Sequence, residues 1–270
     1  MMATQIDPRY PIIGPSVRII IVLLVLCSAG TKADDLAAAL QAFDNAQYSD
    51  SLRQLEIFAK AHPKNPAALY YLGRSQYHAG DFKAAEKSLE ALLKDHPEHI
   101  EGHYLMGSIN VARVSEVSVF RKIATAKAAL ASWLTVVQLD PKHVEGLYAV
   151  ISFYITAPAF AGGDLDKAKA ELPRLEALNP DWAMLAQASL SNKEKQVEQA
   201  QALYQTASQR IQERAFPLFA LANFQLTQQN YGAALATLSE YEQRHHAWND
   251  PKADATKALR EKIESAMGSK

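Results

Sequence analysis

The stretch YYLGRSQYHAGDFKAAEKSLEALLKDHP, residues 70–97, contains two helix-like patterns separated by a short break. Small and apolar residues recur every three or four positions on both sides of the break, which is the spacing of one helical face. Gly80 suits the left-handed residue that ends a helix, and Asp81 suits the cap that begins the next one. Pro97 ends the second pattern, because proline lacks an amide hydrogen and disfavours a helical predecessor. The stretch predicts a helix–turn–helix unit.

The same unit recurs along the chain with a period close to 34 residues. Gly73 and Gly107 are 34 residues apart, and so are Pro63 and Pro97. Helices that cross at about 8–10 Å need small side chains at the contact. Such residues lie in the middle of each expected second helix, at Ser51, Ala85, Ala129, Ala168, Ala200 and Ala234. The repetition predicts an all-α solenoid of about six helix pairs.

Two segments carry a family resemblance. They read Leu69-x-x-Leu72-Gly73 … Gly80-Asp81-Phe82-x-x-Ala85-x-x-x-Leu89 … Pro97 and Leu218-x-x-Leu221-Ala222 … Asn230-Tyr231-x-x-Ala234-x-x-x-Leu238. Both resemble the tetratricopeptide repeat. The resemblance implies a right-handed superhelical solenoid that serves as a binding scaffold, and it names no ligand.

The repeat pattern also sets the expected boundaries of the domain. Units are expected near residues 32–65, 66–99, 100–143, 144–180, 181–214 and 215–248, within a solenoid of residues 34–248. The first unit is degenerate in its first helix, and the fifth lacks the turn glycine and the final proline. Caps of second helices are expected at Asp81, Thr125, Asp164 and Asn230, and Gly163 is expected to be a left-handed residue. Residues 249–270 predict a capping helix, with apolar residues at Ala255, Leu259, Ile263 and Met267.

Residues 1–33 predict a secretory signal peptide. Arg9 and Arg18 precede the apolar run Ile19–Leu26, and small residues follow it. The run is shorter than the roughly 20 residues that span a bilayer, so we expect cleavage near Asp34 and a periplasmic protein. The alternative is an inner-membrane anchor made of uncleaved residues 12–29. Cleavage would remove Cys27, the single cysteine, so the mature chain would fold without disulfides.

Composition and motifs narrow the classes of function. The chain has 28 basic and 29 acidic residues, so no positive excess favours nucleic acid. It contains no phosphate-binding glycine loop, no Gly-x-Ser-x-Gly elbow and no His-Glu-x-x-His helix. His99 and His103 are four residues apart, but the neighbouring acidic residues suit a helix N-terminus better than a metal site. We therefore expect no enzyme, no cofactor and no metal.

The resemblance implies that the first helix of each pair lines a concave groove. Aromatic side chains and arginine, which dominate interface hot spots, recur at these positions, although burial in the core is a competing interpretation for each tyrosine. The candidate partner-binding residues are Tyr70, Arg74, Tyr77, His78, Glu101, Tyr104, Ser108, Tyr148, Ser152, Trp182, Leu185, Phe219 and Asn223. Some family members clamp a carboxylate with lysines and asparagines of neighbouring first helices. Only Arg74 and Asn223 come close to that pattern, and they lie several repeats apart.

Two insertions interrupt the period. Ten extra residues fall within Asn110–Ala124 and five within Thr156–Asp164. Equivalent turns of neighbouring repeats lie on one edge of a solenoid, so the two insertions should approach each other. In one interpretation both flanking helices lengthen and Phe120 packs on Phe160. In the other, Val117, Phe120 and Phe160 form a partner-binding rim.

The sequence therefore predicts a non-catalytic periplasmic scaffold that binds a protein or peptide of the cell envelope through its groove and rim. The expected membrane contact is limited to the N-terminal segment, if that segment is uncleaved. The alternative function is an accessory subunit of a transport or envelope-assembly system that binds a small ligand.

Overall fold

The computed structural model describes residues 32–45, 47–114, 116–244, 250–251 and 253–268. The predicted signal peptide up to residue 31, and the alternative anchor of residues 12–29, lie outside this part. All regular elements in the described part are helical. They are α2 (Lys32–Asp44), α3 (Tyr48–Ala61), α4 (Pro66–Ala79), α5 (Phe82–Asp95), α6 (Ile100–Arg113), α7 (Val119–Leu139), α8 (Val144–Thr156), the short 3₁₀ helix η1 (Ala159–Ala161), α9 (Leu165–Leu178), α10 (Pro180–Lys193), α11 (Val197–Arg210), α12 (Phe216–Thr227), α13 (Tyr231–Gln243) and α14 (Ala253–Gly268).

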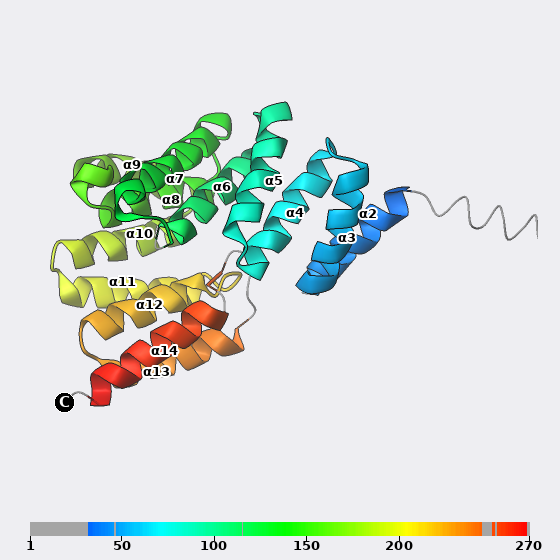
Figure 1. Ribbon diagram of the computed structural model, residues 1–270. Coiled ribbons are helices and arrows are strands. Elements are labelled where there is room, and N and C mark those ends of the chain that lie inside the picture. Colours follow the sequence, from blue (N-terminus) through cyan, green and yellow to red (C-terminus); the bar gives the residue numbers. More distant parts are fainter. Residues whose placement is uncertain (1–31, 46, 115, 245–249, 252, 269–270) are drawn as a thin grey trace, which may run out of the picture.

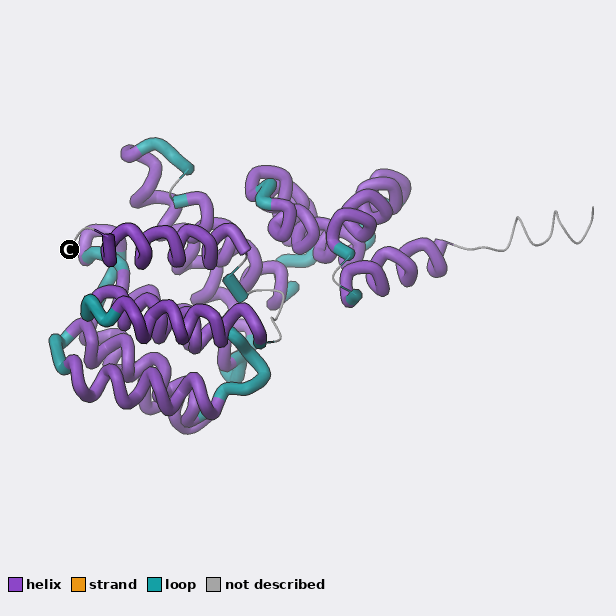
Figure 2. Tube along the Cα trace, turned by 90° about the horizontal axis from the view of Figure 1, so that it is seen from below, coloured by secondary structure: helices purple, strands orange, loops and turns teal. Residues whose placement is uncertain are grey.

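The helices stack as successive pairs that curve around an inner face (Figures 1 and 2). Each helix from α2 to α13 packs on the next, and α14 packs on α13 and α12. First helices of neighbouring pairs also touch, as in α2 on α4, α4 on α6 and α8 on α10, which places them on the inner side. The predicted all-α solenoid is confirmed. None of the described helices combines the length and hydropathy that a membrane span requires.

The small residue predicted in each second helix lies at a tight helix contact. Ser51, Ala85, Ala129, Ala168, Ala200 and Ala234 are all fully buried. The four described hydrophobic clusters are built from residues between Ala39 and Ile263, so a chain that begins at Lys32 retains each of them. Leu259 and Ile263 of α14 belong to the last cluster, together with Leu238 and Tyr241. Ala255 and Met267 are exposed, so the prediction that they share the apolar face of α14 is wrong.

Most of the expected helix caps form. Asp81 Oδ1 accepts from the Ala84 amide at 2.9 Å, and Asp164 and Asn230 make the same bond three residues ahead. Thr125 is wrong as a cap, because α7 already begins at Val119. The expectation for Gly163 is wrong by one residue, since Gly162 has the positive φ of 111°.

The turns before α11 and α13, which lack a glycine, adopt the same left-handed geometry at Lys195 and Gln229. Gly80, with φ of 79°, precedes the cap of α5, and Lys195, with φ of 64°, takes the equivalent place before α11. A side chain with a Cβ is strained in that conformation by about 1–2 kcal/mol. The fifth repeat therefore keeps its turn at a cost in stability.

The insertions change one helix and one turn. α7 has 21 residues whereas α5 and α9 have 14, but α6 has 14 residues like α4, so only one of the two helices is lengthened. The second insertion forms η1, which packs on α7. Phe120 is 95% exposed and Phe160 is 69% exposed. The interpretation in which these two rings pack on each other is wrong.

Candidate functional site

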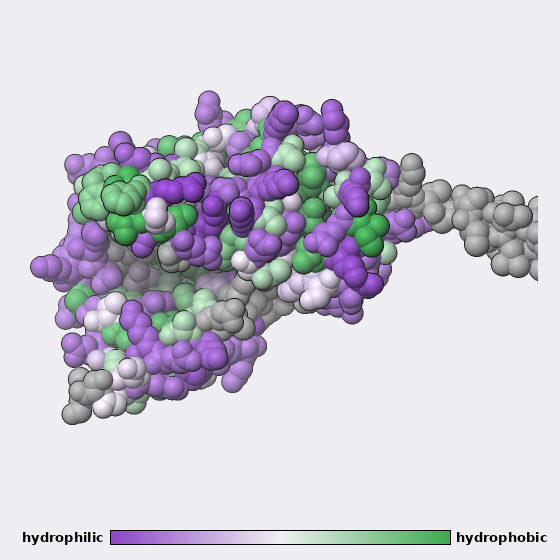
Figure 3. Space-filling view, in the orientation of Figure 1, coloured by the Kyte–Doolittle hydropathy of each residue, from purple (hydrophilic) through white to green (hydrophobic). Residues whose placement is uncertain are grey.

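A cavity of about 380 Å³ opens on the inner face of the solenoid. In Figure 3 a recess separates the upper part of the molecule, which carries α4 to α9, from the lower part with α11 to α14. The walls come from α4, α6, α7, α8, α10, the start of α12 and the residue that follows Asp250. The described lining residues are Tyr77, Tyr104, Ser108, Val111, Trp133, Tyr148, Ala149, Ser152, Phe153, Thr156, Trp182, Arg214, Phe216 and Pro251.

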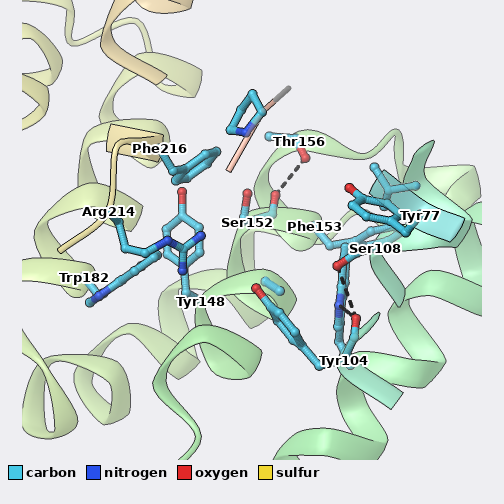
Figure 4. Close-up of a pocket in the computed structure, with 14 residues that line it drawn as sticks. Tyr77, Tyr104, Ser108, Tyr148, Ser152, Phe153, Thr156, Trp182, Arg214 and Phe216 are labelled. Atoms are coloured by element: carbon cyan, nitrogen blue, oxygen red, sulfur yellow. Dashed lines mark hydrogen bonds between the residues drawn. The ribbon is translucent and has the colours of Figure 1, made fainter. Parts of the chain in front are cut away.

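Aromatic side chains form two opposed walls of the cavity. In Figure 4, Trp182, Tyr148 and Phe216 gather on one side together with Arg214, and Tyr77, Tyr104 and Phe153 lie on the other. The Tyr148 ring meets Trp182 edge-on at 5.0 Å and Phe216 at 6.0 Å. Such edge-to-face pairs hold the rings in defined orientations.

Hydroxyl groups between the walls donate to the backbone. Ser108 Oγ donates to the Tyr104 carbonyl at 3.2 Å, and Thr156 Oγ1 donates to the Ser152 carbonyl at 2.7 Å (Figure 4). A hydroxyl that has used its one proton keeps acceptor lone pairs. The cavity therefore presents oxygen acceptors between apolar rings.

Trp133 reaches the cavity from the second helix of its pair because Gly107 leaves room for it. A Cβ on Gly107 would lie 2.3 Å from Trp133 Nε1. That nitrogen donates to the Tyr104 carbonyl at 3.2 Å, which fixes the indole against α6. The glycine predicted from the repeat register thus has a direct role in shaping the site.

A buried charge network lies beside the Trp182 wall. Arg214 Nε donates to Asp250 Oδ1 at 3.1 Å, Arg214 Nη1 donates to Glu145 Oε1, and the guanidinium lies 5.5 Å from the Trp182 ring centroid. Asp250, with a side chain 0% exposed, also accepts from the amides of Ala215 and Phe216 at 3.1 and 3.2 Å. The network ties α8 and the start of α12 to Asp250, which lies three residues before the start of α14 at Ala253. Two carboxylates offset the one guanidinium, so Arg214 is not an unpaired anion receptor.

A second aromatic group joins α2, α3 and α4 away from the cavity. The Arg74 guanidinium lies 4.3 Å from the Phe43 ring and 5.4 Å from the Tyr70 ring. His78 stacks on Tyr48 at 3.9 Å. Burial raises the pKa of Tyr70 well above its usual range, so the phenol stays neutral. Arg74, His78 and Tyr70 therefore hold the first repeats together.

The histidines at the starts of α6 and α8 act as caps. His99 Nδ1 accepts from the Gly102 amide at 3.0 Å, and His143 Nδ1 accepts from the Gly146 amide at 2.9 Å. His143 Nε2 lies 3.1 Å from Glu101 Oε1; this hydrogen bond raises the pKa of His143 and lowers that of Glu101. His103 Nε2 lies 2.8 Å from the Pro97 carbonyl. Within the described residues, no group of three potential ligands could hold a metal ion.

The structure gathers about half of the predicted groove residues in one cavity: Tyr77, Tyr104, Ser108, Tyr148, Ser152 and Trp182. Tyr70, Arg74, His78 and Glu101 lie elsewhere, as described above. Leu185 is fully buried, so its predicted exposure to the groove is wrong. The Phe219 ring packs on Tyr241 at 5.6 Å, and Asn223 donates to the Phe219 carbonyl at 2.9 Å, so neither lines the cavity.

Several lining residues were missed by the prediction. Thr156 lies one helical turn after Ser152, so the helical register of α8 was enough to predict it. Phe153, the residue after Ser152, was also missed. Arg214 and Pro251 lie between helices, and Trp133 belongs to a second helix, which the resemblance does not place in the groove. Their contribution depends on how the repeats curve.

Comparisons with known proteins agree on the fold. A family model described as tetratricopeptide repeat matches residues 36–100 and 73–113. A thermophilic tetratricopeptide-repeat protein from Thermus thermophilus superimposes with a TM-score of 0.58 at 22% sequence identity. The match covers 73% of this chain and 100% of the Thermus chain. A tetratricopeptide repeat protein from Parabacteroides merdae has a TM-score of 0.56 at 16% identity, covering 88% of this chain and 87% of its own. The assembly chaperone of RpL4, residues 1–338, has a TM-score of 0.52 at 13% identity, covering 88% and 97%. No curated protein matches the sequence significantly.

Proposed function

The chain is a tetratricopeptide-repeat protein, and from that premise we propose that it is a non-catalytic scaffold that binds a peptide segment of a partner protein on its inner face. The aromatic cavity anchors one large side chain of that segment. The cavity itself is the observation that carries the proposal: aromatic walls brought together from five first helices around oxygen acceptors.

The composition of the cavity suits a peptide anchor. Buried aromatic and arginine residues near the centre of an interface contribute most of the binding free energy. Tyr104, Tyr148 and Trp182 offer apolar contact area with few rotatable bonds, so little side-chain entropy is lost on binding. The Ser108 and Thr156 hydroxyls offer acceptors to peptide amides, which otherwise lose their hydrogen bonds to water.

The proposed partner belongs to the cell envelope. This part of the proposal is supported by the basic, apolar and small order of residues 1–33, which is typical of an exported chain. Sequencing the N-terminus of the protein recovered from the periplasm tests the location. A start near Asp34 is expected, and an intact N-terminus in the membrane fraction would favour the anchor of residues 12–29.

Site-specific photo-crosslinking tests the groove. A photo-reactive residue replaces Tyr77, which lines the cavity, and a matched control replaces Ile57, which is 69% exposed on α3. We expect a defined adduct with an envelope protein from position 77 and none from position 57. The same adducts from both positions, or none from Tyr77, Tyr104 and Tyr148 alike, would contradict the proposal.

Filling the cavity provides a second readout. Ser152→Trp places a bulky ring in the space without removing an aromatic wall, so we expect partner capture to fall by at least about tenfold while the helical circular dichroism is retained. Unchanged capture by a folded Ser152→Trp protein would refute binding at the cavity.

A small-ligand function remains the alternative, and the cavity volume favours it. About 380 Å³ lies near the lower end of the roughly 300–1,000 Å³ range of small-molecule sites. Thermal shift of the protein against a metabolite panel, compared with the Ser152→Trp variant, separates the two functions. A metabolite that stabilises only the parent protein would support the small-ligand function.

A further inference from the structure

The charge of α7 differs from that of the other second helices. Over its 21 residues α7 carries Arg121, Lys122 and Lys127 and no acidic residue. Each of α3, α5, α9, α11 and α13 carries at least one carboxylate. None of the three basic residues of α7 makes an ion pair with a described residue. The helix therefore presents an uncompensated positive charge.

The outer face of the same helix is apolar. Val119, Phe120, Ile123 and Leu134 are exposed, and Lys127 lies between the last two. Successive residues are rotated by 100° about the axis of α7, which places Val119, Ile123 and Phe120 within an arc of about 100°. Lys122 lies on one side of this arc and Arg121 on the other. The stripe from Val119 to Leu134 is about 22 Å long at 1.5 Å per residue. In Figure 3, hydrophobic residues reach the surface near the place where Figure 1 labels α7 and α9.

The N-terminal part of α7 extends beyond the repeat. Phe120 is 95% exposed, so the solenoid gains no packing energy from it. The next turn along the same edge carries Phe160, which is 69% exposed on η1, and η1 packs on α7. An exposed apolar patch of this kind marks a surface that meets another apolar phase.

We propose that the outer face of α7, together with Phe160, docks onto an anionic lipid surface. A helix with an apolar face, flanking Lys or Arg and no acidic residue matches both parts of such a surface: the rings enter the acyl boundary and the cations meet the lipid phosphates. The positive N-terminal end of the helix dipole lies at the same end as Phe120 and adds to the attraction. An exposed ring at a protruding helix end suits insertion into lipid better than capture in a groove.

This proposal is independent of the peptide cavity, and it departs from the expectation that the chain meets a membrane only through its N-terminal segment. The cavity faces the inner side of the solenoid, whereas the exposed side of α7 faces outward. A chain docked through α7 keeps its groove accessible to a partner.

Vesicle co-sedimentation tests the proposal. The protein of residues 32–270, which retains every described hydrophobic cluster but lacks the apolar N-terminal run, is mixed with phosphatidylcholine vesicles containing about 30% or no phosphatidylglycerol. We expect binding to the anionic vesicles, weakened by added salt, and much less binding to the neutral ones.

Three variants make the result specific to α7. Phe120→Ser with Phe160→Ser should lower the vesicle partition coefficient by at least about tenfold. Arg121→Glu with Lys122→Glu should lower it by about fivefold or more for each basic residue lost. Ile57→Ser, at a position as exposed as Phe160 but on α3, should leave it unchanged. Absence of vesicle binding by the parent protein, or equal binding by the double-serine variant, overturns the proposal. Impaired capture of a protein partner without vesicle binding would assign the face to a protein instead.

Discussion

Gly107→Ala tests whether the repeat glycine shapes the cavity by making room for Trp133. The added Cβ would lie 2.3 Å from Trp133 Nε1 and 2.6 Å from its Cδ1, well inside contact distance. The indole cannot shift without losing its hydrogen bond to the Tyr104 carbonyl. Because Trp133 is buried, its displacement also disturbs its neighbours.

The expected magnitude follows from opposing contributions. Alanine gains about 1 kcal/mol over glycine within a helix. Overpacking costs about 1–3 kcal/mol and the lost hydrogen bond about 1 kcal/mol. The net loss of unfolding free energy is about 1–3 kcal/mol, and for a chain of this size each kcal/mol lowers Tm by roughly 2–4 °C.

Thermal and urea unfolding, followed by circular dichroism, measure the effect. Gly232→Ala is the matched control, because a Cβ at Gly232 of α13 meets no atom within 4 Å, so this variant should be unchanged or more stable. Adding Trp133→Phe to Gly107→Ala should recover part of the loss, since the smaller ring relieves the clash. A Gly107→Ala protein as stable as the parent, or an equal loss in Gly232→Ala, would refute the reasoning.

Three further predictions concern the scaffold. Asp250→Asn should lower the unfolding free energy by about 2–4 kcal/mol in urea titrations, because it unpairs the buried Arg214 and weakens the start of α12. The control Glu261→Gln, on the exposed side of α14, should change the unfolding free energy by less than about 0.5 kcal/mol. Lys195→Gly should raise Tm, since it relieves about 1 kcal/mol of left-handed strain, and an unchanged Tm would argue against that strain. The charge attraction of the Glu101–His143 pair should be fully present between pH 4.5 and 6.5, the ordinary pKa values of the two groups. Loss of the Gly146 cap offsets part of it there, because protonated His143 Nδ1 no longer accepts that amide. The contribution of the charge attraction falls as pH rises through the raised pKa of His143, and as pH drops through the lowered pKa of Glu101. Glu101→Gln should remove this component from the pH–stability profile.

Much of the fold follows from local sequence signals. Alanine at the crossing points, Asp81 and Gly80 at the turn, and the prolines after second helices each act within a few residues, so their roles do not depend on the curvature of the stack. The inner positions of Tyr104, Tyr148 and Trp182 follow from helical register in the same way. Thr125 failed as a cap because the last residues of the insertion, from Val119 on, already form the first turns of α7.

The sequence by itself determined that the chain is a repeat of helix pairs and that Tyr104, Tyr148 and Trp182 face inward, because both depend on periodicities of a few residues. Only the tertiary structure decided where the cavity forms. Trp133 enters it across Gly107, and Arg214 meets Glu145 and Asp250 from positions 69 and 36 residues away. These contacts depend on the small rotations between repeats, which accumulate along the solenoid and have no local signature in the sequence.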